Sequence, residues 1–374
     1  MKKKLIIVLC IVLAVLIAGG AVGYSFLPHP LNYKIKSIQP VGSSVTVLGS
    51  TEDAVTIRKD GDGDFKILMF TDMHLDGKNE SSYLTVDHLV KNVQREKPDL
   101  VILGGDNVTS GMNKKRAKQL GEIFEQLGVY WAGVLGNHEG DNKWSISRTE
   151  MVNIFASYGH CLMRRGLDTV TGDCNYALYI ENADGTLRKA FYFLDSFDEM
   201  NDAQKAQYGW TEDMSSYDGP KADQVAWYAA KAAETTEKYG ENESIMVIHI
   251  PLLQMRLNAL PSGSFSRDEP GTEGFVYGAQ REGVCCTGYE NGLFDAVKAA
   301  GTTTVFSGHD HLNNFAVEVD GVLLSYIEAS GYGSYSMRSK GYPESEWLQG
   351  YTALSIAENG EYTHTQVRNA ELAE

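Results

Sequence analysis

The sequence predicts an α/β protein built around a parallel sheet. Short apolar runs of strand length alternate with longer segments whose apolar residues recur at helical spacing, which is typical of parallel strands joined by crossover helices. The clearest stretch predicts a strand at 66–71, a helix at 81–97, a strand at 99–103, a helix at 114–127 and a strand at 129–135. A second observation is that residues able to bind ions follow the ends of these strands.

The limits of these elements follow from residues that end helices. Pro98 ends the first helix because proline cannot continue one, and Gly128 closes the second. Farther along, the same patterns predict strands at 176–180, 190–194, 244–250 and 303–307, and helices at 222–237 and 291–300. A run of strands is expected from there to Val367. Residues 259–288 are rich in glycine, serine and charge, and we expect a long surface loop there.

The first 27 residues differ from the rest of the chain. Lys2, Lys3 and Lys4 precede a run from Leu5 to Leu27 that carries no charge. A positive start followed by an apolar run is an export signal, which orients the remainder away from the cytoplasm. The run reaches the length of about 20 residues that spans a membrane. We therefore expect an anchor in the cell membrane with the rest of the protein on the extracytoplasmic side; secretion after signal cleavage is the alternative.

Three parts of the chain are expected from this pattern. Residues 1–27 would be the N-terminal membrane anchor or signal segment, residues 28–59 a tether with the start of a first hairpin, and residues 60–374 one large α/β domain. Pro28, Pro30 and Pro40 favour the tether. The hairpin would join strands at 54–58 and 65–71 through the Asp-Gly-Asp-Gly turn at 60–63.

The charge of the chain excludes one class of partner. There are 49 Asp and Glu residues against 33 Lys and Arg residues, and the formal net charge is −16. Polymeric nucleic acid is therefore not an expected partner, because backbone phosphates are bound by a basic surface. Five cysteines are too few for a disulfide scaffold. Whether Cys161 pairs with Cys174, or Cys285 with Cys286, stays open.

Five predicted strand ends carry aspartate, asparagine or histidine. These residues are Asp72 and His74, Asp106, Asn137 and His138, His249, and His309 and His311. Sites in open α/β sheets form at the carboxyl ends of strands, so the five ends are expected to converge. Their carboxylate, amide and imidazole groups suit two divalent ions such as Mn, Fe or Zn. Two ions about 3.5–4 Å apart can bind a phosphoryl group and generate hydroxide.

The same five strand ends resemble the ordered sequence blocks of calcineurin-like metallophosphoesterases: D-x-H, G-D, G-N-H-D/E, H and G-H-x-H. The closer resemblance is to the branch related to purple acid phosphatases, and it is carried by the segments 134–139, 193–196, 249–252 and 307–311. It covers about residues 60–370. The resemblance implies a four-layer α/β/β/α sandwich with a dimetal site at the C-terminal ends of the strands.

The resemblance also implies a role for each matching residue. The first metal would be held by Asp72, His74, Asp106 and His311, and the second by Asp106, Asn137, His249 and His309. His138 would lie beside the phosphate, where it would stabilise the transition state or protonate the leaving oxygen. The implied activity is hydrolysis of a small phosphate ester by a metal-bridging hydroxide nucleophile, outside the cytoplasm.

Two positions depart from purple acid phosphatases. Thr109 stands where those enzymes have an iron-binding tyrosine, and His74 stands where they have glycine, so no iron–tyrosinate centre is expected. Thr109 also cannot replace the aspartate that orients the third-block histidine of related Ser/Thr phosphatases, which leaves the partner of His138 open. Two alternative functions remain: a phosphodiesterase or nuclease acting on small nucleotides or phospholipid headgroups, and a non-catalytic surface-binding module on the same fold.

Overall fold

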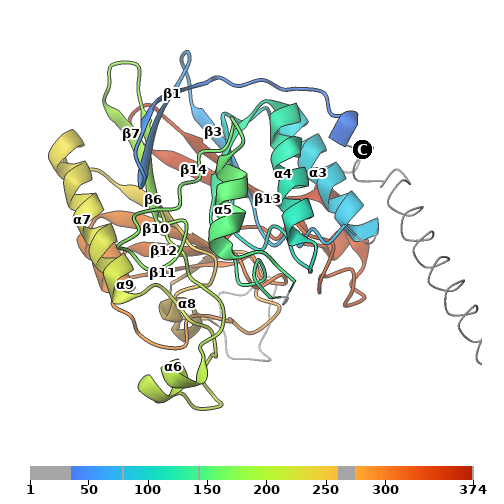
Figure 1. Cartoon of the computed structure of the whole chain (residues 1–374), viewed down its shortest axis with the longest axis vertical. Helices are drawn as coiled ribbons and strands as arrows, with labels where there is room; N and C mark the ends of the chain where they lie inside the picture. Colours follow the sequence, from blue (N-terminus) through green and yellow to red (C-terminus); the bar gives the residue numbers. More distant parts are fainter. Residues whose placement is uncertain (1–34, 78–79, 142–143, 260–273, 373–374) are drawn as a thin grey trace, which may run out of the picture.

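The strands of the protein form two mixed sheets. The structure is a computed structural model that describes residues 35–77, 80–141, 144–259 and 274–372 (Figure 1). Within them, one sheet has the order β1 (Val45–Ser50), β2 (Ala54–Lys59), β6 (Tyr176–Glu181), β7 (Leu187–Phe193), β8 (Ser244–Val247), β10 (Thr302–Ser307), β12 (Val322–Tyr326), β11 (Ala316–Val319) and β9 (Phe275–Tyr277). The other has the order β14 (Tyr362–Arg368), β13 (Gly350–Ile356), β3 (Phe65–Phe70), β4 (Leu100–Leu103) and β5 (Tyr130–Gly133).

Each sheet has parallel strands at its centre. Strands β3, β4 and β5 are parallel, and Ile102 pairs with both Met69 and Ala132. Strands β7, β8, β10 and β12 are parallel in the larger sheet. Antiparallel strands form both edges of the larger sheet and one edge of the smaller sheet, whose other edge is the parallel strand β5. The carboxyl ends of the parallel strands in each sheet therefore lie at one edge.

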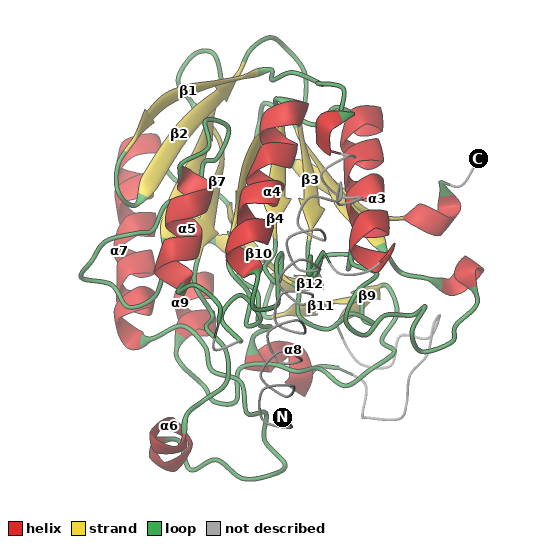
Figure 2. Cartoon of the chain, turned by 45° about the vertical axis from the view of Figure 1, so that its right-hand side comes forward, coloured by secondary structure: helices red, strands yellow, loops and turns green. Residues whose placement is uncertain are grey.

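Helices cover the outer faces of the two sheets (Figures 1 and 2). The longer helices are α3 (Glu80–Glu96), α4 (Asn113–Leu127), α5 (Arg148–Ala156), α7 (Ala222–Tyr239) and α9 (Leu293–Ala299). Shorter segments are α6 (Asp202–Gln207), α8 (Leu253–Leu257), η1 (Glu344–Glu346) and η2 (Asn369–Glu371). Helices α3, α4 and α5 pack on the smaller sheet, and α7 and α9 pack on the larger one.

Alternation of buried side chains along β6 shows how the layers form. Tyr176, Leu178 and Ile180 join the core between the two sheets, whereas Ala177 and Tyr179 join the core beneath α7. Successive side chains of a strand point to opposite faces, so a strand buried on both sides needs apolar residues at every position. The predicted four-layer α/β/β/α sandwich is confirmed.

The predicted first hairpin is wrong. Strand β2 lies in the larger sheet between β1 and β6, whereas β3 lies in the smaller sheet between β13 and β4. Residues 45–50 of the predicted tether form β1. The Asp-Gly-Asp-Gly segment at 60–63 does favour a turn. The buried apolar run of β3, however, requires a central position that is covered on both faces. Burial therefore separates the two strands and overrides the local preference for a hairpin.

Other predictions fall partly outside the described residues. The anchor or signal segment predicted at 1–27 lies outside them, and so does 260–273 of the predicted long loop. The rest of that loop contains strand β9. Among the described residues, no helix combines the length and the apolar character needed to cross a bilayer. The four described cysteines, Cys161, Cys174, Cys285 and Cys286, are free thiols.

Candidate metal centre

The five predicted strand ends meet where the two sheets adjoin. The site residues from Asp72 to His138 follow strands β3, β4 and β5 of the smaller sheet. Those from His249 to His311 follow strands β8 and β10 of the larger sheet. Backbone hydrogen bonds join neighbouring turns: the Asp72 N–H donates to the Gly105 carbonyl (3.0 Å), and the Gly308 N–H donates to the His249 carbonyl (3.0 Å). Between sheets, the His309 N–H donates to Asp72 Oδ2 (2.9 Å).

Four of these residues have an unusual backbone conformation. Asp72, His74, Asp106 and His309 have positive φ angles of 55°, 45°, 50° and 81°. A side chain with a Cβ atom rarely adopts this left-handed region, which costs on the order of 1–3 kcal/mol per residue. Such conformations cluster where the surrounding structure turns side chains toward a functional position. Here the strained backbone directs four side chains toward the same point.

A first cluster contains Asp72, His74 and His311, all buried. Their ligand atoms approach closely: His74 Nε2 lies 3.1 Å from His311 Nε2, and His311 Nε2 lies 3.3 Å from Asp72 Oδ1. The other nitrogen of His311, Nδ1, bonds the Tyr335 carbonyl at 2.6 Å. That bond leaves Nε2 of His311 facing the cluster, as expected for a metal-binding imidazole.

A second cluster contains Asp106, His249 and His309, with Asn137 beside it. His249 Nε2 lies 3.3 Å from Asp106 Oδ2 and 3.0 Å from Asn137 Oδ1. The His249 Nδ1 atom bonds the Gly104 carbonyl at 2.8 Å, so its Nε2 atom is the one turned inward. The carbonyl thus selects which nitrogen of this imidazole can bind an ion.

Asp106 lies between the two clusters. Its Oδ2 atom is 3.4 Å from His74 Nε2 in the first cluster and 3.3 Å from His249 Nε2 in the second. Its Oδ1 atom accepts the His138 backbone N–H at 2.8 Å. This carboxylate therefore has the position of a bridge, with one oxygen held by the chain and the other directed toward both clusters.

Buried atoms without hydrogen-bond partners test whether metal ions fit this centre. Among the described residues, Asp72 Oδ1, Asp106 Oδ2 and His309 Nδ1 are buried and have no hydrogen-bond partner. An orphaned buried polar atom costs about 1–3 kcal/mol, so native structures rarely leave several together. Carboxylate, imidazole and amide groups are the ligands that divalent Mn, Fe or Zn prefers. The residues fit two such ions.

Electrostatics set the protonation of the donors. Burial lowers the pKa of His74 to about 4 and that of His309 to about 3. Burial raises the pKa of Asp72, but its interaction with nearby His311 outweighs burial and leaves the value at about 2. For His249, burial is outweighed by Asp106, and its pKa rises to about 10. Three donors are thus already in the state that binds metal, whereas His249 must lose a proton to bind.

The partner that the sequence left open for His138 is Asp141. The His138 side chain is 37% exposed at the mouth of the centre, and its Nε2 atom lies 3.8 Å from Asp106 Oδ2. Its Nδ1 atom pairs with Asp141 Oδ2. Burial lowers the pKa of His138, but Asp141 and Asp106 raise it to about 9. The spacing of three residues was a signal that the sequence contained and that sequence reasoning missed.

Glu139 and Arg148 support the ligand-bearing loops. Glu139 is fully buried, and its Oε1 accepts the Asn107 N–H (2.7 Å) while its Oε2 accepts the Gly136 N–H (2.8 Å). Arg148 donates to the Gly136 carbonyl (2.6 Å) and pairs with Asp195. Glu139 thereby ties the turn after β4 to the turn after β5. Sequence reasoning left the role of Glu139 undecided, and nothing in the sequence marked Arg148.

Gly136 shows why glycine stands beside the ligands. A Cβ atom at this position would lie 2.1 Å from Asp106 Oδ1, well inside van der Waals contact. The backbone of the third turn can therefore approach the bridging carboxylate only because the residue before Asn137 has no side chain.

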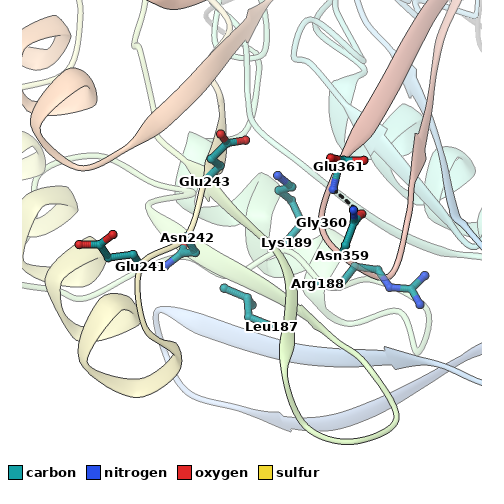
Figure 3. A pocket seen from close by; sticks show the side chains of 9 residues that line it. All are labelled: Leu187, Arg188, Lys189, Glu241, Asn242, Glu243, Asn359, Gly360 and Glu361. Atoms are coloured by element: carbon teal, nitrogen blue, oxygen red, sulfur yellow. Dashed lines mark hydrogen bonds between the residues drawn. The ribbon is translucent and has the colours of Figure 1, made fainter.

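A separate cavity of about 490 Å³ lies at the opposite end of the larger sheet (Figure 3). It is lined in part by Glu243, which directly precedes β8, whereas His249 follows the other end of that strand. Lys189 points between Glu243 and Glu361 in this cavity (Figure 3). None of the predicted site residues lines it.

The two carboxylate–imidazole clusters share one aspartate and lie where two sheets with parallel strands adjoin. This arrangement defines a class of proteins: two-sheet α/β proteins with a candidate dinuclear metal centre. Comparison with known families makes the identification specific. The chain belongs to the calcineurin-like phosphoesterase family, whose model matches residues 65–313.

Relatives come from plants and yeast. "Probable inactive purple acid phosphatase 14" of Arabidopsis thaliana is 28% identical over 314 residues, which cover 75% of this chain and 73% of that protein. "Phosphatase DCR2" of Saccharomyces cerevisiae is 26% identical over 323 residues, covering 78% of this chain and 50% of that protein. A solved dimetal phosphatase from Danio rerio is 16% identical, with a TM-score of 0.48 over 82% of this chain and 100% of that chain. The predicted family and its purple-acid-phosphatase-like branch are confirmed.

Proposed function

We propose that this protein is a metal-dependent phosphoesterase that hydrolyses a small phosphate ester. One observation supports the proposal above the others: Asp106 is shared by two buried clusters, and its inward oxygen, like that of Asp72, has no hydrogen-bond partner among the described residues. Membership in the calcineurin-like phosphoesterase family agrees with this chemistry.

Each cluster would hold one ion. The residues proposed for the first are Asp72, His74, Asp106 and His311, and those for the second are Asp106, Asn137, His249 and His309. When bound, two divalent ions supply Lewis-acid polarisation of the phosphoryl oxygens and a hydroxide nucleophile at neutral pH.

His138 is proposed to act on the leaving group. Asp141 occupies its Nδ1 atom, so Nε2 is the nitrogen left to face a substrate at the mouth of the centre. In hydrolysis, water adds to phosphorus, the ester P–O bond breaks, and the departing oxygen takes a proton. A donor held at that oxygen typically accelerates such a step by about 10²–10⁴-fold.

We also propose that the reaction takes place outside the cytoplasm. The uncharged run from Leu5 to Leu27 behind three lysines supports an anchor or a signal peptide. Fractionation of cells that express the full chain, followed by protease treatment of intact cells, tests this placement. Protection of the body from external protease in intact cells would contradict it.

The test of the catalytic proposal uses the purified full chain loaded with Mn, Zn, Fe or Mg. We expect two ions per chain and metal-dependent turnover of an aryl phosphomonoester or phosphodiester. Asp106→Asn should lose both ions, whereas His138→Ala should keep both and lose about 10²–10⁴-fold in kcat. Asp295→Asn, which changes an exposed carboxylate on α9, is the matched control. Two bound ions with no turnover on either substrate would refute the proposal.

A non-catalytic module on the same fold is the second candidate. It is favoured by one observation: relatives of 27–28% identity carry the name "Probable inactive purple acid phosphatase". The complete set of carboxylate, imidazole and amide donors in this chain supports the catalytic alternative. Fewer than one bound ion per chain under metal-replete conditions would favour the non-catalytic module.

A further inference from the structure

A second cavity, of about 640 Å³, lies beside the metal centre. It is open to solvent, and three segments distant in sequence line it: residues 281–283, Leu312 and residues 340–343. Leu312 directly follows His311 of the first cluster. The cavity is therefore adjacent to the centre along the chain as well as in space.

One wall separates this cavity from the first cluster. The Tyr335 ring stacks on the His311 ring with centroids 4.1 Å apart and an interplanar angle of 7°. Glu282, which lines the cavity, uses Oε1 to accept the Leu312 N–H (2.7 Å) and the Tyr335 hydroxyl (3.1 Å). These hydrogen bonds hold the wall in place and occupy Oε1 of the Glu282 carboxylate.

Arg281 lines the cavity and, within the part of the chain that the structure describes, has donors without partners. Its Nη1 atom lies 3.5 Å from Glu346 Oε2, and its guanidinium lies 5.5 Å from the centre of the Tyr342 ring. Its Nε and Nη2 atoms are buried and, among the described residues, have no hydrogen-bond partner. These two nitrogens form one edge of the guanidinium, which matches two oxygens of a phosphate or carboxylate. Burying two such donors without an acceptor is costly, so an acceptor is expected there.

Lys340 adds a second positive charge to the same cavity. It is exposed, and its Nζ atom lies 5.8 Å from the centre of the Tyr335 ring. That ring is the one that stacks on His311. Arg281 and Lys340 give the lining two positive charges against the single carboxylate of Glu282, and this balance favours an anionic ligand.

We propose that this cavity is a subsite for a second oxyanion of the substrate, a phosphate or a carboxylate carried by its alcohol part. The inference rests on the proposed function and makes it more specific: the preferred substrates are phosphate esters with an anionic leaving group. Tyr342, Pro343 and Leu312 offer the carbon skeleton an apolar surface between the two anionic ends.

The experiment compares matched substrates on the metal-loaded full chain. Fructose 1,6-bisphosphate against fructose 6-phosphate tests a second phosphate, and 6-phosphogluconate against glucose 6-phosphate tests a carboxylate. For each pair we take the ratio of kcat/KM for the substrate with the anionic leaving group to kcat/KM for the substrate with the uncharged leaving group. We expect a ratio above one for at least one pair, and Lys340→Ala should lower that ratio about tenfold, as the loss of a charge-assisted contact predicts. Arg281→Lys, which keeps the charge and loses the two-nitrogen edge, should lower it too.

Lys118→Ala is the control, because it removes an exposed positive charge from α4 outside the cavity. A loss of general structure would lower both members of a pair and leave their ratio unchanged. Ratios near one, or ratios that Lys340→Ala and Arg281→Lys leave unchanged in an active enzyme, would overturn the subsite while the proposed function stands.

If no substrate is turned over, titration calorimetry decides the question without catalysis. The metal-loaded full chain is titrated with fructose 1,6-bisphosphate and with 6-phosphogluconate. Binding that weakens about tenfold when Lys340→Ala is added would keep the subsite although the proposed activity fails. No binding, or binding that Lys340→Ala does not weaken, would overturn the subsite as well.

Discussion

Glu139→Gln provides a demanding test of how the metal centre is held together. The fully buried glutamate carboxylate accepts the Gly136 N–H (2.8 Å) on one oxygen, and the Asn107 N–H (2.7 Å) and the Val108 N–H (3.4 Å) on the other. Glutamine keeps the shape but replaces one oxygen with an NH₂ group. In the orientation that costs least, the NH₂ group faces the Gly136 N–H, which is left without a partner.

The size of the effect follows from that single orphaned group. An unsatisfied buried donor costs about 1–3 kcal/mol. We therefore expect the free energy of unfolding to fall by about 1–3 kcal/mol. Because Gly136 and Asn107 flank the ligands Asn137 and Asp106, metal affinity should fall as well, by about 10–100-fold, as is usual when a group that supports a ligand is lost.

Two measurements check this expectation. Urea unfolding of the chelator-treated full chain reports the change in free energy without metal, and competition with a chelator reports metal affinity. Glu150→Gln is the matched control, because Glu150 is exposed and pairs with Lys114 on the surface, where such a pair contributes about 0–1 kcal/mol. If Glu139→Gln changes stability by less than Glu150→Gln and leaves metal affinity within twofold, the carboxylate does not join the two loops as argued.

Three further predictions concern other parts of the structure. Asp141→Asn should keep both ions and lower kcat about tenfold, because it loosens the orientation of His138; a normal kcat at full metal content would contradict this. Gly136→Ala should displace Asp106, since the new Cβ would lie 2.1 Å from its Oδ1, and should cost about 1–3 kcal/mol of stability together with metal binding, measured by unfolding and metal analysis. Burial raises the pKa of Glu328 from 4.5 to about 8, so the stability that its protonated form contributes is fully present below pH 4.5 and is lost as the pH rises to about 8. Glu328→Gln should remove that loss, up to about 1 kcal/mol per pH unit, and unfolding curves of variant and wild type that stay parallel from pH 5 to 8 would refute this.

The part of the fold that the sequence predicted best is the stretch from β3 to β5. Its strands are continuous apolar runs, and its helices α3 and α4 end at Pro98 and Gly128, so local pattern and tertiary structure agree. The first hairpin failed for the opposite reason. A Gly-containing turn favours pairing of its flanking strands, but β3 needed cover on both faces and left β2 to the other sheet.

The candidate site divides in the same way. The identity and order of the ligand-type residues could be read along the chain, because each block is only a few residues long. The roles of Glu139 and Arg148 could not. Arg148 meets Asp195 only because the start of α5 lies against the end of β7, a contact across 47 residues.

The sequence by itself determined the chemical repertoire of this protein: carboxylates, imidazoles and an amide at strand ends, an α/β alternation, and an apolar start. These are properties of short segments of sequence, and they do not depend on how the rest of the chain folds. Only the tertiary structure decided that His74 and His311, 237 residues apart, face each other, that Asp106 lies between two clusters, and that Arg281 and Lys340 share a cavity beside them. Such contacts depend on how two sheets pair and pack, and that is decided by the burial of the whole chain rather than by any one segment.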